Sequence, residues 1–254
     1  TSLPRRTRLR KPASVSTRNT SPEVAGSGIN TAVIPLGAVE AKGPHLPVGA
    51  DMLLADVFGV AYAGAAGSVY LLPALPYGCS ESLRAFRGTV YLDAETMWHV
   101  LADLVASLRQ GGFARFTVLN LCSTNWVVKP TVRELNLRLG LGRVVWAEPK
   151  QFAYDLYHST REGLDDNHAG AVDTALMMHL RPDCVGDLPP DHVPQVGREF
   201  VDYVGLAPVA PTGVWGTPSQ ATPALGEELF SHMLASPRAY VAAAYATWDA
   251  EDAP

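Results

Sequence analysis

The sequence predicts a single-domain α/β protein built around a mainly parallel sheet. Short, β-rich apolar runs alternate along the chain with helical patterns of ten or more residues, an order typical of βαβ units. Four of the six residues in the run Phe116–Leu121 are apolar, as expected for a parallel strand that is buried on both faces. Hydrophobic residues make up 47% of the 254 residues and charged residues 18%, so the chain can bury a large core and is not disordered throughout.

The expected elements follow one another from residue 31 onward. Strands are expected at Thr31–Leu36, Val69–Leu72, Phe116–Leu121 and Arg143–Ala147. Helices are expected at Met52–Ala65, Ala94–Gln110, Trp126–Leu139 and Gly170–Leu180. The helical pattern is clearest in Ala94–Gln110, where apolar residues recur on one face and two glycines end the helix. In a parallel sheet of this kind, functional loops leave the carboxyl ends of the strands.

Two regions of the chain differ in charge. Residues 1–28 hold six basic residues against Glu23 alone, a net charge of +5, and contain few apolar side chains. We expect a flexible basic arm there, with an organelle transit peptide as the alternative. Residues 29–254, the expected α/β domain, hold fourteen basic and twenty-four acidic residues, a net charge of −10. An acidic domain argues against nucleic acid as a partner.

Composition also predicts the compartment. Three cysteines in a chain of this length argue against a disulfide framework and favour a reducing, cytoplasmic location. No apolar run reaches about 18 residues, so no membrane-spanning segment and no membrane partner are expected.

Polar residues and glycines gather in four loops and one late segment: Gly37–Asp51, Gly78–Thr89, Asn120–Asn125, Asp165–Thr174 and Gly213–Thr222. The first holds the carboxylates Glu40 and Asp51, and the fourth holds Asp165, His168 and Asp173. Carboxylates with a histidine on strand-end loops suit divalent metals or general acid–base chemistry. The alternative for each aspartate is a turn or helix-cap role.

These loops resemble those of the creatininase (creatinine amidohydrolase) family, over about residues 30–235. Gly37–Asp51 reads GAVEAKGPHLPVGAD, against the family's G-[ST]-x-E-Q-H-G-P-H-L-P-x-G-x-D, and the other loops follow in the family's order. The resemblance implies an α/β/α layered sandwich and a homo-oligomer, often a hexamer. It also implies a small-molecule substrate and two zinc or manganese ions, whose bridging water attacks an amide-type carbonyl.

The first loop departs from the family's pattern at one residue that matters. Glu40 and Asp51 match the family's acidic ligands, but Lys42 stands where the family has a histidine ligand. An ammonium group has no lone pair for a metal and carries a positive charge of its own. We therefore expect Lys42 to replace the ion in a site without a metal cofactor. Zinc or manganese remains the alternative, with Glu40, Asp51 and Cys122 as residual ligands.

Later loops depart as well. Cys122 stands in place of another histidine ligand, Ala171 in place of a glutamate, and Asp173 is the acid two places further on. His168 is retained, and the resemblance implies that it is a catalytic acid or base. Cys122 follows an expected strand and precedes an expected helix, and a helix N-terminus and Lys42 would both lower the pKa of its thiol. Cys122 is then either a nucleophile served by His168 or an inert apolar filler.

We thus expect the catalytic residues Glu40, Lys42, Asp51, Cys122, His168 and Asp173, and the substrate-binding residues Ser80, Arg87, Thr124, Asp165 and Trp215. The leading hypothesis is a metal-independent enzyme that acts on a C–N bond of a small amide, lactam or amidine, by hydrolysis or by the reverse condensation. The alternatives are a catalytically inactive subunit that binds a ligand or serves as a scaffold, and a mononuclear zinc amidohydrolase.

Overall fold

The computed structural model describes residues 14–141, 143–160 and 166–251. Within these residues, five parallel strands form one sheet in the order β1-β3-β2-β4-β5. The strands are β1 (Val15–Ser16), β2 (Thr31–Leu36), β3 (Tyr70–Leu71), β4 (Arg115–Asn120) and β5 (Arg143–Ala147). The predicted α/β class with a mainly parallel sheet is confirmed.

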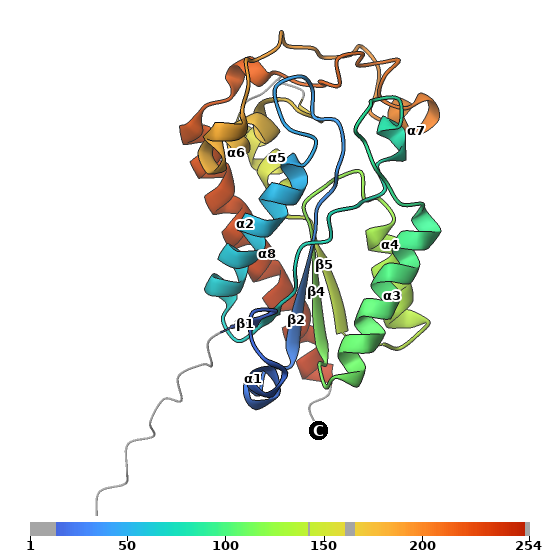
Figure 1. Ribbon diagram of the computed structural model, residues 1–254, viewed down its shortest axis with the longest axis vertical. Coiled ribbons are helices and arrows are strands. Elements are labelled where there is room, and N and C mark those ends of the chain that lie inside the picture. The colour runs from blue at the N-terminus through green and yellow to red at the C-terminus, as the bar shows by residue number, and fades with distance from the viewer. Residues whose placement is uncertain (1–13, 142, 161–165, 252–254) are drawn as a thin grey trace, which may run out of the picture.

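Helices cover both faces of the sheet (Figure 1). Helices α2, α5, α6 and α8 lie on one face, and α3 and α4 lie on the other. The helices are α1 (Ser21–Gly26), α2 (Ala50–Ala66), α3 (Ala94–Gln110), α4 (Val128–Leu137), α5 (Pro149–Thr160), α6 (Ala171–Leu180), α7 (Phe200–Val204) and α8 (Pro223–Glu251). Short 3-10 turns lie at Glu81–Leu83, Pro182–Cys184 and Pro218–Gln220.

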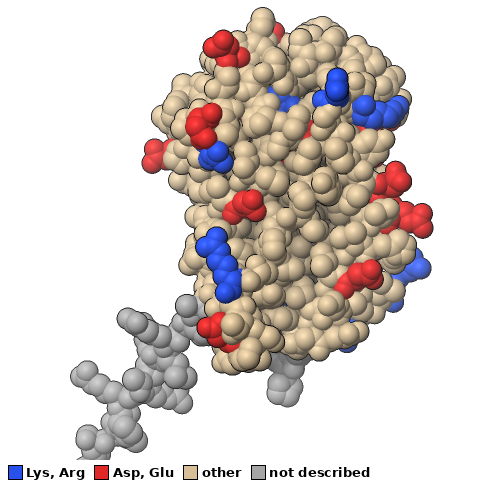
Figure 2. Space-filling model, in the orientation of Figure 1, with Lys and Arg blue, Asp and Glu red and all other residues tan. Residues whose placement is uncertain are grey.

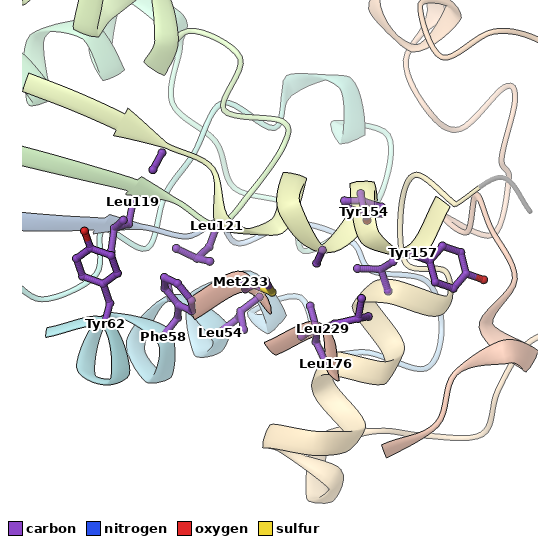
Figure 3. Packing of buried hydrophobic residues seen from close by; sticks show 14 of the residues in the cluster. Leu54, Phe58, Tyr62, Leu119, Leu121, Tyr154, Tyr157, Leu176, Leu229 and Met233 are labelled. Atoms are coloured by element: carbon purple, nitrogen blue, oxygen red, sulfur yellow. The ribbon is translucent and has the colours of Figure 1, made fainter. Parts of the chain in front are cut away.

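The strands are buried on both faces because successive side chains point to opposite sides. In β4, Leu119 belongs to the core under α2, α5, α6 and α8, and Val118 to the core under α3 and α4. Figure 3 shows Leu119 together with Phe58 and Tyr62 of α2 in the first of these cores. Two apolar layers therefore hold the sheet in place.

The expected flexible arm is shorter than predicted. Val15–Ser16 forms β1 at the edge of the sheet, where the Val15 amide donates to the carbonyl oxygen of Val69 at 2.9 Å. Helix α1 follows, with Thr20 and Glu23 in a capping box. Residues 14–28 therefore do not form the predicted flexible arm, because hydrogen bonds hold the edge strand and the capped helix and Val24 packs against the core under α3 and α4. Residues 1–13 lie outside the described residues.

The expected elements agree with the structure where the apolar pattern is regular. The bounds of β2, α3 and β5 are as predicted, and the ends of the other predicted strands and helices differ from the observed ones by at most two residues. Helices α5 and α8 were not predicted. Helix α8 continues through the buried Pro237, a residue type that usually interrupts a helix.

The loops that follow the strands lie together in the upper half of Figure 1, between α6 and α7. Among the described residues, no helix is long and apolar enough to cross a membrane. On the face shown in Figure 2, acidic and basic side chains are scattered among uncharged ones. The expectation that nucleic acid is not a partner stays a prediction.

A matched pair of glycine substitutions tests how closely α6 and α8 pack. At Gly226 of α8, an added Cβ would overlap the carbonyl oxygen of Ala175 in α6, whereas the exposed Gly64 in α2 has open space. We expect Gly226→Ala to lower the free energy of unfolding by about 1–3 kcal/mol through overpacking. We expect Gly64→Ala to raise it by about 0.5–1 kcal/mol, because alanine is the better helix former. Denaturant unfolding measures both, and the same sign for both would contradict this packing.

Candidate active site

Three loops meet through the side chain of Asn125. Its Oδ1 accepts a hydrogen bond from the Cys79 amide at 2.8 Å, and its Nδ2 donates to the carbonyl oxygen of Gly37 at 3.2 Å. A Cβ at Gly78 would overlap this side chain, so the close approach requires glycine there. The ends of β2 and β4 are thereby joined to the loop that begins at Gly78.

Lys42 lies at the centre of a buried ionic cluster. Its Nζ is 2.9 Å from Oε1 of Glu40, 3.1 Å from Oδ2 of Asp51 and 3.3 Å from Oδ2 of Asp173. All four side chains are buried. Burial disfavours the ammonium, but the three carboxylates outweigh it and raise the pKa of Lys42 well above its usual value. The predicted convergence of Lys42 with these acids is therefore present.

A second lysine, which sequence reasoning missed, completes the cluster. Lys150 lies in the first turn of α5, just after β5, and its Nζ is 2.9 Å from Oδ1 of Asp51 and 2.5 Å from Oδ1 of Asp173. Burial opposes its charge, yet the two aspartates raise the pKa of Lys150 above its usual value. One signal was available, because Lys150 follows the carboxyl end of a strand, at the same sheet edge as the predicted loops.

Ser80 and Thr124 position Glu40. Both hydroxyl groups donate to its Oε2, at 2.6 Å from Ser80 and 2.7 Å from Thr124. Burial raises the pKa of Glu40, but Lys42, His168 and these hydroxyl groups reverse the effect, so its pKa lies below the usual range. Ser80 is fully buried, and the structure gives it a role in holding Glu40. Thr124 also lines a cavity, described below, as expected of a substrate-binding residue.

The ring of His168 is held by the backbone of the first loop. Its Nε2 lies 2.8 Å from the carbonyl oxygen of Ala41, which can only accept, so Nε2 carries the proton and Nδ1 keeps a lone pair. Nδ1 is 3.8 Å from Oε1 of Glu40. Burial, followed by the charge of Lys42, lowers the pKa of His168, so the ring is neutral at pH 7.

Cys122 lacks the surroundings of a nucleophile. Its side chain is fully buried, and Sγ lies 2.9 Å from Oγ1 of Thr124. Burial, then Asp51 and Glu40, raise the pKa of the Cys122 thiol well above its usual value despite the nearby lysines. Helix α4 begins only at Val128, so the expected helix does not start beside this thiol. The structure therefore does not support the expected lowering of the thiol pKa by Lys42, and a catalytic role for Cys122 stays a prediction.

The turn that carries His168 and Asp173 is fixed by Asp166. Both of its carboxylate oxygens accept hydrogen bonds from the first turn of α6, from the Ala171 amide at 3.0 Å and the Val172 amide at 2.7 Å. Burial raises the pKa of Asp166 to about 7. Its neighbour Asp165, the predicted substrate-binding residue, lies outside the described residues.

Two cavities open beside the cluster. The smaller, of about 40 Å³, is lined by His168, Trp215 and Thr124 among others. The larger, of about 680 Å³, is lined by Trp126, Arg84 and Tyr203 among others. They share the lining residues Ser82, Ser123, Thr124, Arg198 and Val201 and therefore adjoin. A pocket of this combined size can hold a small molecule.

The structure brings most of the other predicted residues together but not Arg87. Trp215 is buried, lines the smaller cavity, and its backbone pairs with that of His168. Arg87 is exposed and lines neither of these cavities, so its predicted role in binding substrate is not supported. The next residue, Gly88, has a φ of +100°, a backbone conformation that favours glycine.

Glu40, Asp51 and Cys122, the residual metal ligands predicted from the sequence, do lie close together. One potential ligand atom from each is within 4.8 Å of the other two. The ammonium of Lys42 lies against two of them, at 2.9 Å from Glu40 and 3.1 Å from Asp51.

The parallel sheet, with buried carboxylates, lysines and a histidine in the loops and helix starts at one edge, defines this chain as an α/β protein with a buried acid–base site. A family model described as creatinine amidohydrolase matches residues 17–240. The chain therefore belongs to the creatininase family, as the motifs predicted.

The curated proteins that this chain resembles include a creatinine amidohydrolase and a peptide peptidase. The creatinine amidohydrolase of Pseudomonas putida is 30% identical over 217 residues, which cover 77% of this chain and 81% of that protein. A mycofactocin precursor peptide peptidase of Mycobacterium ulcerans is 27% identical over 219 residues, 80% of each chain.

Solved creatininases share the fold. One described as a manganese form has a TM-score of 0.69 at 24% identity, covering 90% of this chain and 97% of that one. A variant described as of Zn-Zn type has a TM-score of 0.71 at 23% identity, with the same coverage. The layered α/β fold expected from the family is thus confirmed.

Proposed function

We propose that this protein is a metal-independent member of the creatininase family that acts on a C–N bond of a small molecule, with His168 as general base. The observation that carries the proposal is the neutral His168 ring beside the pocket, next to a carboxylate cluster already filled by ammonium groups. A base must be unprotonated and close to its substrate, and His168 meets both conditions.

The residues of this cluster do not fit a pair of zinc ions, such as the description of one solved creatininase gives. The Nζ atoms of Lys42 and Lys150 each lie within 3.3 Å of at least two carboxylates. An ammonium cannot be a ligand, and it repels a cation placed beside it. A single zinc on Glu40, Asp51 and Cys122 would have to displace Lys42, so the mononuclear alternative is not favoured. The proposed reaction therefore involves no metal ion.

Without a metal, the reaction must be easier than hydrolysis of an ordinary amide by water. Free water has a pKa of about 15.7, against about 7 when zinc holds it. Neither Lys42 nor Cys122 replaces the nucleophile, because the raised pKa of each keeps it protonated. Proton transfer to a histidine contributes roughly 10²–10⁴-fold. The substrate must therefore carry an activated carbonyl or its own amine nucleophile, as in cyclisation or condensation.

In the proposed reaction, Nδ1 of His168 takes the proton from the attacking amine or water, and the new bond forms at the carbonyl carbon. The proton then passes from Nδ1 to the leaving group as the carbonyl re-forms and the bond between the carbonyl carbon and the leaving group breaks. Ala41 holds Nε2–H throughout, which keeps Nδ1 available for both transfers.

One observation favours a second function, that of a ligand-binding subunit without catalysis. Three carboxylates lie within 3.3 Å of the Lys42 ammonium, as many as it has N–H bonds, so Lys42 has no donor left for a developing oxyanion. The adjoining pocket remains open for a ligand in either case. Homo-oligomerisation, with a hexamer as the family resemblance implies, and the cytoplasmic location stay predictions.

The decisive experiment measures turnover after prolonged treatment with a chelator. Creatinine, a short peptide, activated amides and linear ω-amino esters are supplied, and products are followed by mass spectrometry. We expect product from an activated or self-cyclising substrate, at a rate that chelation leaves unchanged. Turnover that appears only when zinc or manganese is added would overturn the proposal. Binding of these compounds without any product would favour the ligand-binding subunit.

A further inference from the structure

We propose that Lys42 and Lys150 act together as a pair of internal cations in place of two metal ions, and that removing Lys42 opens a metal site in this chain. The inference goes beyond the proposed function, which concerns turnover at His168. Both proposals hold that the native protein contains no metal, but the test of this inference needs no substrate.

The first argument is the way the carboxylates bridge the two ammonium groups. Asp51 places Oδ2 at 3.1 Å from Lys42 and Oδ1 at 2.9 Å from Lys150. Asp173 does the same, with Oδ2 at 3.3 Å from Lys42 and Oδ1 at 2.5 Å from Lys150. Each carboxylate thus gives one oxygen to each cation, which is how a carboxylate bridges two metal ions.

The second argument is that the arrangement depends on the whole fold rather than on one loop. Lys42 comes from the loop after β2, Lys150 from the start of α5, and Asp173 from α6. Charged groups that are neighbours in sequence can lie together by chance. Groups that come from three separate elements around a sheet do so less easily. Both lysines are fully buried, at 2% and 1% exposure. Removing two ammonium groups from water is unfavourable, and the ion pairs with the carboxylates must offset this cost.

Charge explains why cations are needed. Glu40, Asp51 and Asp173 are buried together and would repel one another if nothing lay between them. Two ammonium groups reduce the charge of this cluster from −3 to −1. The lysines therefore neutralise the buried carboxylates, as bound cations do in a metal centre.

The atoms around Nζ of Lys42 show what would bind once that side chain is shortened. Oxygen atoms of Glu40, Asp51 and Asp173 surround the vacated position, and Sγ of Cys122 is near the first two. Three oxygens and one sulfur suit a tetrahedral ion such as Zn²⁺ or Co²⁺. On binding, the thiol proton leaves to solvent and the thiolate forms the metal–sulfur bond. The position of Lys150 has two of these carboxylates and would take a second ion more weakly.

The experiment compares Co²⁺ uptake by four proteins: wild type, Lys42→Ala, Lys42→Ala/Lys150→Ala and the control Lys129→Ala. Lys129 is an exposed lysine that lies over Trp146 and forms none of the ion pairs of the cluster. Each protein is purified with a chelator, incubated with Co²⁺ and desalted. Elemental analysis then gives the metal content, and near-ultraviolet absorption reports a cobalt–thiolate bond.

We expect wild type and Lys129→Ala to retain no Co²⁺ and Lys42→Ala to retain about one ion per chain with a cobalt–thiolate band. Adding Cys122→Ser to Lys42→Ala should abolish the band. The double lysine variant should retain more metal than Lys42→Ala. Folding of a variant only when Co²⁺ or Zn²⁺ is present also supports the proposal, because the ion then replaces the missing ammonium.

Three results would overturn the proposal: stoichiometric metal in the wild type, no more metal in folded Lys42→Ala than in Lys129→Ala, or failure of Lys42→Ala to fold with or without metal. A double variant that binds no more than Lys42→Ala would refute the part played by Lys150. If the wild-type protein still turns over substrate after treatment with a chelator, the proposed function stands whatever metal the variants bind. The two proposals can therefore fail separately.

Discussion

Replacing Asp173 with asparagine is expected to lower the free energy of unfolding by about 3–5 kcal/mol, the cost of removing one partner from a buried ion pair. The change keeps the size of the side chain but removes the negative charge shared by Lys42 and Lys150. Two buried ammonium groups would then have only Asp51 and Glu40 to offset them. Urea unfolding at pH 7 measures the loss.

The matched control is the pair of Glu134 and Arg138 at the end of α4, whose atoms lie 2.6 Å apart and whose side chains are 32% and 77% exposed. We expect Glu134→Gln to change stability by less than about 1 kcal/mol, because water screens exposed ion pairs. Similar losses in both variants would show that burial adds nothing to the cluster, contrary to the structure.

The same cluster predicts how stability depends on pH. Lys150 and Lys42 outweigh the effect of burial and hold the pKa of Asp173 well below its usual range, and the pKa of Glu40 is lowered as well. Unfolding returns both carboxyl groups to ordinary values of about 4, so the unfolded chain takes up protons that the folded protein does not bind. Their stabilisation is therefore complete above about pH 5 and is lost as the pH falls further. Asp173→Asn should show a shallower decline in acid.

Local patterns predicted the elements well because each depends on its own residues. Strand β2 and helix α3 agree with their predicted bounds, since apolar spacing decides where they begin and end. The family motifs likewise placed Glu40, Lys42 and Asp51 in one site. These residues lie within twelve positions of one another, so the motif that names them also holds them together.

Long-range contacts could not be predicted in the same way. Lys150 pairs with Asp51 across 99 positions of sequence, and no motif links the two. The pKa of Cys122 depends on a balance between buried carboxylates and lysines that only the folded geometry sets. The predicted helix also begins two residues before the observed start of α4, so the expected effect of its N-terminus on the thiol is not supported.

His168→Gln is expected to lower the rate of the proposed reaction by roughly 10²–10⁴-fold, the usual contribution of a positioned general base. Glutamine can still donate a hydrogen bond to Ala41, so the loop should keep its shape while the nitrogen lone pair is lost. The measurement is kcat and KM on the substrate found by the turnover screen. The effect should fall on kcat, because a base acts on the reacting atoms rather than on substrate affinity.

The matched control is His192→Gln, because Nε2 of His192 also lies against a backbone carbonyl, that of Val209 at 3.0 Å, but the residue lines neither active-site cavity. We expect it to change kcat only slightly. Since burial and Lys42 lower the pKa of His168, wild-type activity should persist below pH 6.5, where an ordinary histidine becomes protonated and stops acting as a base. Equal losses in the two variants, or an acid limb above pH 6.5, would mean that His168 serves the fold and that this pocket binds its ligand without acting on it.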